Sequence, residues 1–253
     1  MGSIHGRAAL TAIVPSPSPA TTSFRDMPKP TRLPRIFVVR HGETEWSLSG
    51  QHTGLTDIPL TANGEDTIRA LGKRIAGPGK ILDPSHIKHA FVSPRKRAQK
   101  TFELLFENCS TGSPEHSLEE GVREWEYGVA EGKVTKDIKA ELGDDWQIWD
   151  DGCPGGESAQ QMSDRCDAMI EKIVDLTSSH HGQEDSEGHG DVLIVSHGHF
   201  SRCFLTRWAG LNLSQGRIFV SDAGAMSICG FQHRSFDERS LLGLNLFGSI
   251  EAE

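Results

Sequence analysis

The 253 residues of the chain, 36% of them hydrophobic, suffice for one sizeable domain and are too few for two comfortable ones. A formal net charge of -9 argues against nucleic acid as a partner, because nucleic-acid binding depends on basic patches that face phosphates. No stretch is long and apolar enough to cross a bilayer, and five cysteines without a CxxC pair indicate reduced thiols. We therefore expect a cytoplasmic protein with neither a membrane nor a nucleic-acid partner.

Residues 1–35 differ in composition from the rest of the chain. They hold six of the twelve prolines, many Ser, Thr and Ala residues, and a single acidic residue, Asp26. Such a segment cannot support a core, which predicts a disordered leader followed by one domain over residues 36–253. The acid-poor composition is similar to that of an organellar transit peptide, but Pro15, Pro17 and Pro19 would break the helix that such peptides form.

Short apolar runs alternate with amphipathic helices along the domain. The first helix is expected to begin after the capping residue Thr61 and to end near Gly77, and the second carries Arg95 and Arg97 in its first turn. A third helix is predicted over about 158–176. The apolar runs predict strands at 36–39, 89–92, 192–195 and 226–231. This alternation is typical of an α/β fold, a three-layer αβα sandwich around a mostly parallel central sheet.

Two segments lack helical or strand periodicity. Residues 119–161 place four aromatic side chains, those of Trp125, Tyr127, Trp146 and Trp149, among acids and glycines, which predicts an inserted lid. These aromatics either form a wall for the apolar face of a sugar or fill a small core, and we expect two of them in the core. Residues 178–191 predict a flexible loop, although its histidines His180, His181 and His189 leave metal binding as an alternative.

Histidines follow two of the predicted strands at their carboxyl ends. His41 follows the first strand and His197 follows the strand at 192–195, while the strand at 89–92 runs toward Arg95 and Arg97. In open α/β sheets, ligands bind beyond the carboxyl ends of the strands. We therefore expect these histidines and arginines to share one site.

Five short stretches occur in a fixed order around these positions. They are Arg40–Trp46, Thr53–Asp57 with Leu60 and Thr61, Ser93–Ala98, Glu124–Gly128 with Glu131 and Gly132, and Ser196–Gly198. In this order they resemble the signature of the histidine phosphatase superfamily, in its phosphoglycerate mutase-like branch. The resemblance covers residues 36 to about 231, and it implies a phosphoglycerate mutase-like fold that transfers a phosphoryl group without a cofactor or metal.

The resemblance also implies roles for single residues. His41 becomes the nucleophile that forms a phosphohistidine, Arg40 and Arg97 hold the phosphate, and His197 donates to its oxygens. Glu124 is the expected proton donor to the leaving group, with Glu126 as its rival. The expected substrate-binding residues are Arg40, Ser47, Thr53, Gly54, Arg97, Glu124, Tyr127, His197 and Gly198. A contact from Arg95 stays open, and His197 with His199 could form a metal-ligand pair, which we regard as the weaker interpretation.

These roles predict a metal-independent phosphatase that acts on a small phosphate ester, with a sugar phosphate or bisphosphate as the preferred class. Residues 50–57, 123–128 and 146–149 resemble the sedoheptulose bisphosphatase-type phosphatases of fungi, and the short region after Trp208 is similar to bacterial acid phosphatases. A phosphoglycerate mutase is the alternative. It is disfavoured by Asp150 and Asp151, which stand where mutases clamp a second anion with bases, and by Ser47, which replaces their usual Asn.

An inactive interaction module of the same fold is a further alternative. It is disfavoured because such a module has no reason to retain all of the reacting groups. The sequence does not predict an oligomeric state.

Overall fold

The computed structural model describes residues 2, 32–180 and 190–248, and the domain that it contains begins at Arg32. Within these residues one sheet of six strands has the order β3-β2-β4-β1-β5-β6. Its strands are β1 (Ile36–Arg40), β2 (Ile87–Val92), β3 (His116–Leu118), β4 (Asp191–Ser196), β5 (Met226–Phe231) and β6 (Arg239–Leu246). The first four strands in this order pair with one another in parallel, β5 pairs antiparallel with β1, and β6 pairs antiparallel with β5. The predicted, mostly parallel sheet is confirmed.

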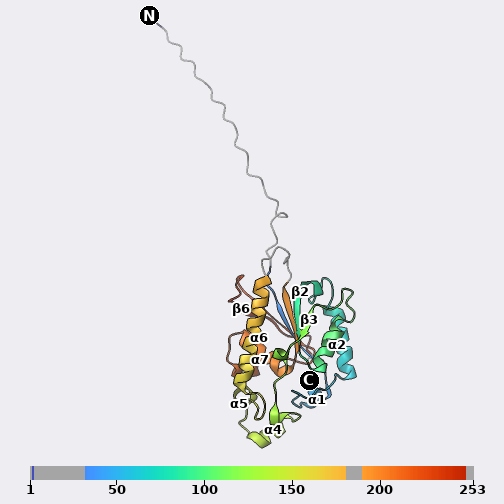
Figure 1. The fold of residues 1–253 in the computed structure, drawn as a ribbon, viewed down its shortest axis with the longest axis vertical. Coiled ribbons are helices and arrows are strands. Elements are labelled where there is room, and N and C mark those ends of the chain that lie inside the picture. Colours follow the sequence, from blue (N-terminus) through green and yellow to red (C-terminus); the bar gives the residue numbers. More distant parts are fainter. Residues whose placement is uncertain (1, 3–31, 181–189, 249–253) are drawn as a thin grey trace. The chain divides into compact units, whose positions relative to one another are not determined.

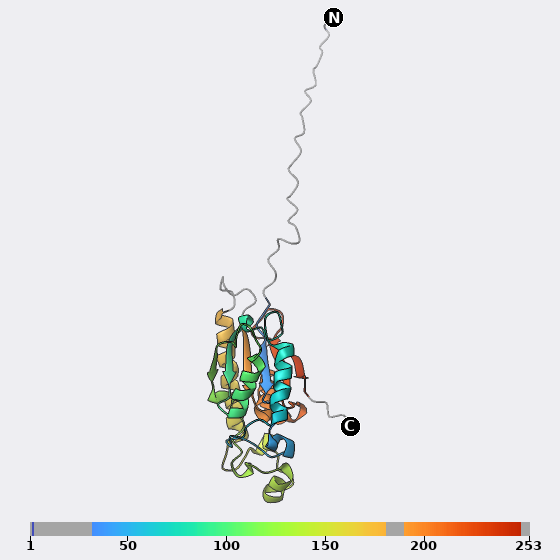
Figure 2. The same ribbon diagram turned by 90° about the vertical axis from the view of Figure 1, so that its right-hand side faces the viewer.

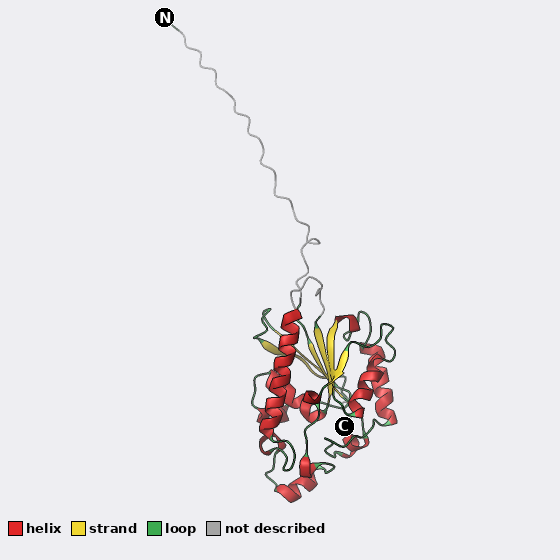
Figure 3. Cartoon of the chain, in the orientation of Figure 1, coloured by secondary structure: helices red, strands yellow, loops and turns green. Residues whose placement is uncertain are grey.

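Helices cover both faces of this sheet (Figures 1 and 3). Helices α2 (Ala62–Ile75) and α3 (Lys96–Phe106) pack on one face, and α6 (Ala159–His180) and α7 (Gly198–Trp208) pack on the other. Figure 2 turns the α2 side toward the viewer. The shorter elements are α1 (Glu45–Ser49), α4 (Thr135–Leu142), α5 (Ile148–Asp151), η1 (Pro84–His86), η2 (Glu120–Val122), η3 (Gly128–Ala130) and η4 (Leu213–Ile218). The expected three-layer αβα sandwich is therefore present.

The central strands are apolar on both faces because each face meets a helical layer. In β1, Phe37 and Val39 pack with the side chains of α2 and α3, whereas Ile36 and Val38 pack with those of α6 and α7. Successive side chains of a strand point to opposite faces, so one continuous apolar run supplies both cores. Within the described part of the chain, none of the helices combines the length and the apolar content needed to cross a membrane.

Helix α2 begins and packs as its sequence predicts. The Thr61 hydroxyl accepts a hydrogen bond from the Gly64 amide at 2.9 Å, which satisfies one of the free donors of the first turn. Ile68 is among the residues of α2 that face the core. A Cβ at Gly72 would lie 2.5 Å from the Leu105 carbonyl oxygen, so this glycine allows α2 and α3 to cross closely.

The folded domain begins before the predicted boundary at residue 36. The Asp191 carboxylate has a side chain only 1% exposed, and it accepts hydrogen bonds from the guanidinium groups of Arg32 and Arg35 and from the Arg35 amide. Residues 32–35 thus belong to the domain, and the expectation of a leader reaching residue 35 is wrong at that end. The rest of the predicted leader, apart from Gly2, lies outside the described residues.

The loop predicted over 178–191 is structured at both of its ends. Helix α6 continues to His180, four residues beyond the predicted end, and the Gly190 amide donates to the His86 carbonyl. His181 and His189 lie outside the described residues. Strands β3 and β6 were not predicted, because β3 has three residues and β6 is half exposed at the sheet edge, so neither shows an apolar run.

Residues 119–161 contain η2, η3, α4 and α5, and they contribute to the core on the α6 and α7 side. Trp125, Tyr127, Trp146 and Trp149 are all at most 8% exposed, so the expectation that only two are core residues is wrong. The indole N–H of Trp125 donates to the Glu157 carbonyl and that of Trp146 donates to the Gly152 carbonyl, which explains how these rings can be buried. That the segment acts as a lid stays a prediction.

We predict that Asp191→Asn lowers the free energy of unfolding by about 2 kcal/mol, because an amide N–H₂ would then face guanidinium donors in a buried place. Urea denaturation measures the change. Asp66→Asn is the matched control, since the Asp66 side chain is 80% exposed in its ion pair with Arg69. The control should change stability by less than about 0.5 kcal/mol. Equal effects of the two substitutions would contradict the anchoring role of Asp191.

Candidate active site

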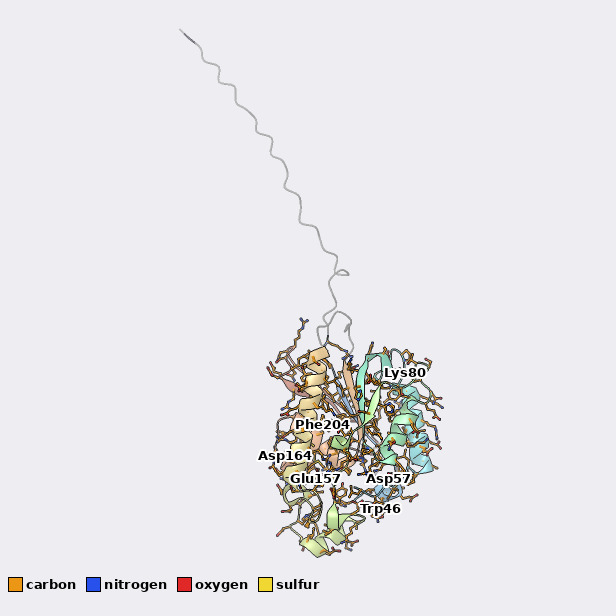
Figure 4. The ribbon with its side chains drawn as sticks, in the orientation of Figure 1. Trp46, Asp57, Lys80, Glu157, Asp164 and Phe204 are labelled. Atoms are coloured by element: carbon orange, nitrogen blue, oxygen red, sulfur yellow. The ribbon has the colours of Figure 1, made fainter. Side chains whose placement is uncertain are left out.

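The carboxyl ends of three parallel strands meet at one edge of the sheet. Arg40 of β1 lies opposite Ser196 of β4, and Val92 of β2 lies opposite Val195 of β4. The residues that follow these strands are therefore neighbours, and the rings of His41 and His197 have centroids 5.2 Å apart. The structure thus brings together the two histidines that the sequence places after separate strands. Figure 4 labels Trp46 and Asp57 toward this end of the domain and Lys80 at the opposite end.

The hydrogen bond of His41 fixes which ring nitrogen is free. His41 Nδ1 lies 2.7 Å from the Gly42 carbonyl oxygen, and because a carbonyl can only accept, the proton resides on Nδ1. The Nε2 atom is left with a lone pair. Burial, followed by repulsion from Arg97 and Arg40, holds the pKa of His41 well below its usual value. His41 is therefore a neutral imidazole with an unprotonated nitrogen at neutral pH.

A fully buried arginine lies beside these histidines. The Arg97 guanidinium is 0% exposed, and it donates to His197 Nδ1 at 3.1 Å and to the backbone carbonyls of Thr53, Gly54 and Thr56. Within the described chain it forms no ion pair with a carboxylate. Burying a charge without a counter-ion is costly, so this position favours a bound anion.

Arg97 also fixes the tautomer of His197. A guanidinium has no acceptor, so Nδ1 of His197 must accept, and its proton is on Nε2. That N–H donates to the Ser93 hydroxyl at 2.7 Å, just after β2. Burial, followed by repulsion from Arg97 and His41, lowers the pKa of His197 well below its usual value. His197 is thus neutral and is held between two strand ends.

Arg40 is positioned by a glycine. Its Nη1 donates to the Ser221 carbonyl at 2.6 Å, while its Nε is buried and has no partner in the part of the chain that the structure describes. A Cβ at Gly198 would lie 3.2 Å from the Arg40 Cζ atom and 3.3 Å from its Nε atom. Gly198 therefore supports the site by allowing the guanidinium to lie against the start of α7.

Glu124 lies against the N-terminus of α7. Its carboxylate accepts hydrogen bonds from the amides of His199 at 3.1 Å and Phe200 at 2.8 Å, and also from the Trp125 amide. Amides in the first turn of a helix lack helical partners, so they are free to hold this carboxyl group. Glu124 lines the cavity described below and Glu126 does not, which favours Glu124 of the two candidates.

A cavity of about 390 Å³ opens beside His41. The predicted residues that line it are Arg40, His41, Ser47, Thr53, Glu124, Tyr127 and Gly198. Arg97, His197 and Gly54 do not line it and lie behind its wall. A Cβ at Gly54 would lie 2.5 Å from the Trp125 carbonyl oxygen, and its own carbonyl accepts from Arg97, so Gly54 serves the packing of Arg97. Direct contact of Gly54, Arg97 and His197 with substrate stays a prediction, since none of the three lines the cavity.

The hydroxyl groups of two further residues predicted to bind substrate already form hydrogen bonds within the protein. The Ser47 hydroxyl takes part in the capping box of α1, accepting from the Thr44 amide and donating to its carbonyl. The Thr53 hydroxyl donates to the Gln51 carbonyl at 3.1 Å. Arg95, which the sequence left open, does not line the cavity.

Several residues that line the cavity were missed in the sequence. They include His52, His199, Arg202, Arg217 and Asp222. The spacing of Arg202, four residues after Gly198 on α7, is a signal that would have placed it on the same helix face. Asp222 depends on the unpredicted strand β6, where Asn245 donates to its carboxylate at 2.8 Å. His52 and Arg217 had no such signal.

Among the described residues, no group of three or more His, Cys, Asp or Glu side chains could hold a metal ion. The weaker alternative of a metal-ligand pair also meets a geometric objection. His197 contacts Arg97 and Ser93, whereas His199 Nδ1 bonds the Tyr127 hydroxyl at 2.7 Å, so the two rings serve separate contacts.

Comparison with known proteins agrees with this geometry. A family model described as the histidine phosphatase superfamily, branch 1, matches residues 36–242. The chain belongs to this superfamily. It is 33% identical over 255 residues to sedoheptulose 1,7-bisphosphatase of Saccharomyces cerevisiae, covering 84% of this chain and 93% of that protein. It is 39% identical over 212 residues to an acid phosphatase of Mycobacterium tuberculosis, covering 83% and 92% of the two chains.

Solved structures of the superfamily share the fold. An open reading frame product of Mycobacterium tuberculosis aligns with a TM-score of 0.70 at 35% identity, covering 85% of this chain and 98% of that one. A putative alpha-ribazole-5'-P phosphatase of Escherichia coli aligns with a TM-score of 0.69 at 23% identity, covering 87% of this chain and all of that one. The predicted phosphoglycerate mutase-like fold of this histidine phosphatase is therefore confirmed.

We predict that stability falls as the pH drops below about 6.5, the pKa of an unfolded histidine. His41, His197 and His199 have folded-state pKa values well below that, chiefly through burial. The unfolded chain therefore binds more protons there, and each extra proton lowers the free energy of unfolding by about 1.4 kcal/mol per pH unit. Urea denaturation between pH 7.5 and 5.5 measures the slope.

The control for this slope is an exposed histidine. His233→Gln should leave the slope unreduced, because Glu238 raises the pKa of His233. His197→Gln should make the slope shallower by up to about 1.4 kcal/mol per pH unit, the contribution of one proton. Stability that stays constant or increases as the pH falls over this range would contradict the assignment of neutral, buried imidazoles.

Proposed function

We propose that the protein is a metal-independent phosphatase that hydrolyses small phosphate monoesters through a phosphohistidine on His41. The observation that carries the proposal is the neutral His41, whose Nε2 keeps its lone pair close to the buried guanidinium of Arg97, which forms no ion pair with a carboxylate among the described residues. A nucleophile that needs no deprotonation and a cation that needs an anion are what phosphoryl transfer from a dianion requires.

The proposed reaction has two steps. In the first, His41 Nε2 forms a bond to phosphorus while the bond from phosphorus to the ester oxygen breaks, and Glu124 gives its proton to the leaving oxygen. In the second, water attacks the phosphorus and transfers a proton to Glu124, and the bond from Nε2 to phosphorus breaks. The products are the alcohol and inorganic phosphate, and both residues return to their starting states.

Positive charge surrounds the proposed phosphate position. Arg40 reaches it from the cavity wall, with a buried Nε that has no hydrogen-bond partner among the described residues. Arg97 does not line the cavity, and its charge acts through a buried region where charge is poorly screened. Donors that are already in place when charge develops need no reorganisation, which is the main source of catalysis in such sites.

A sugar phosphate or bisphosphate is the substrate class that we favour. One relative is named for a sugar bisphosphate, and another is named as an acid phosphatase. The cavity has room for a group beyond the phosphate, and Arg202 and Arg217 provide positive charge along it. A second phosphate of a bisphosphate would be placed near them.

Phosphoglycerate mutase activity is the alternative. A probable phosphoglycerate mutase of Salmonella newport is 30% identical over 183 residues, covering 70% of this chain and 75% of that protein. Asp150 and Asp151 are exposed and do not line the cavity, so the expectation that they repel a second anion is wrong. Hydrolysis stays favoured because both relatives that match over more of the chain are phosphatases by name.

The setting of the reaction is a proposal as well. All five cysteines are free, and burial raises the pKa of the Cys166 thiol to about 12. Unpaired, unreactive thiols suit the reducing cytoplasm, which we propose as the compartment, with organellar import as the alternative.

We predict that wild-type protein releases p-nitrophenol from p-nitrophenyl phosphate in the presence of EDTA, and that His41→Ala lowers kcat at least about 10³-fold because the nucleophile is lost. His233→Ala is the matched control, since this histidine has a side chain 76% exposed and should leave the rate unchanged. After acid-free quenching during turnover, phosphate label should remain on His41. A labelled protein carrying the His41→Ala change, or activity abolished by EDTA, would sink the proposal.

A second measurement separates hydrolysis from transfer. With 3-phosphoglycerate and with sugar phosphates, we expect inorganic phosphate to accumulate and no isomeric phosphoglycerate to form, because a water molecule accepts the phosphoryl group from His41. Phosphorus NMR follows both products in one sample. Isomer formation faster than phosphate release would establish the mutase alternative.

A further inference from the structure

Three aromatic side chains form one wall of the cavity beside Glu124: His52, Tyr127 and His199. The His52 ring meets Tyr127 edge to face, with centroids 4.8 Å apart, and lies nearly parallel to the His199 ring at 5.7 Å. The Tyr127 hydroxyl lies 2.7 Å from His199 Nδ1. None of the steps proposed above uses His52 or His199, although both imidazoles line the cavity.

The contact with Tyr127 assigns a proton to His199. Burial raises the pKa of Tyr127 well above its usual value, so its hydroxyl keeps its proton. Within the described chain, His199 Nδ1 is the hydrogen-bond partner found for this hydroxyl, and we assign the hydroxyl as the donor and Nδ1 as the acceptor. The neutral His199 ring then carries its own hydrogen on Nε2, and that N–H is a donor available to the cavity.

His52 has the opposite arrangement. Its Nδ1 lies 3.0 Å from the Lys133 carbonyl oxygen, which can only accept, so the hydrogen of this ring is on Nδ1. The Nε2 atom therefore presents a lone pair. Burial lowers the pKa of His52, which keeps the ring neutral at neutral pH. The wall thus offers one acceptor, on His52, and one donor, on His199.

We infer that His52 and His199 form a subsite for hydroxyl groups, so that the substrate is the phosphate ester of a polyol. A hydroxyl is both donor and acceptor, so one can donate to His52 Nε2 while its neighbour accepts from the His199 Nε2–H. A phosphate dianion has no proton to donate, and the His52 lone pair would repel it. The subsite therefore favours neutral hydroxyls over a second phosphate, which is left to Arg202 and Arg217.

This inference rests on the proposed phosphatase function, and substrates that differ only in hydroxyl groups test it. We compare kcat/KM for glucitol 6-phosphate with that for n-hexyl phosphate, and for ribitol 5-phosphate with that for n-pentyl phosphate. Wild-type protein should prefer the polyol in at least one pair. His52→Phe keeps a ring against Tyr127 and removes the acceptor, so it should lower that preference about three- to tenfold, chiefly through KM.

A second variant and a control complete the design. His199→Phe removes the donor and should lower the preference in the same direction, and thermal unfolding checks that both variants are folded. His233→Phe, at an exposed position, should leave the preference unchanged. Hydrolysis without any polyol preference in the wild type, or an equal loss for polyol and alkyl esters in both variants, would overturn the subsite alone. If the wild type hydrolyses no ester, p-nitrophenyl phosphate included, the proposed function fails and the subsite fails with it.

Discussion

The site depends on the buried positive charge of Arg97, which has no carboxylate partner within residues 32–180 and 190–248. Arg97 is held by three backbone carbonyls from residues 53–56 and by His197, and these neutral acceptors fix its geometry without cancelling its charge. A carboxylate partner would have made the fold easier to stabilise, but it would also have removed the attraction for an anion. Other features follow from this choice. Gly54 has no side chain, which lets the backbone of residues 53–56 approach Arg97. His197 must be neutral because its Nδ1 accepts a hydrogen bond from the Arg97 guanidinium.

The site also depends on four neutral imidazole rings. His41, His52, His197 and His199 all have pKa values below the usual value for histidine, and burial is the largest cause in each case. Because a neutral imidazole has one donor and one acceptor, each hydrogen bond at one nitrogen determines what the other nitrogen offers. Gly42 and Lys133 carbonyls leave lone pairs on two rings, whereas Arg97 and the Tyr127 hydroxyl leave N–H donors on the other two.

The fold could be predicted where a residue pattern has a single structural explanation. The apolar runs of β1 and β4 mark strands covered on both faces, and Thr61 marks the start of α2, so these elements were correct. Strand β6 was missed because it is half exposed and contains Gly243, which gives neither an apolar run nor strict alternation. The anchoring of Asp191 by Arg32 and Arg35 was missed because an ion pair over more than 150 residues leaves no local pattern.

The candidate site was predictable only where strand ends determined it. His41 and His197 follow parallel strands, and the geometry of such a sheet brings them together whatever lies between them. His52 and Asp222 come from loops and Arg217 from the short helix η4, and their approach to the cavity depends on tertiary packing that no local pattern shows. The same reason explains the error over Asp150 and Asp151. Their positions in the chain suggested the second anion site, but both acids are exposed, whereas Trp149 on the same helix is buried and packs against Arg202. The charged side chain that reaches the cavity there is that of Arg202, which is positive.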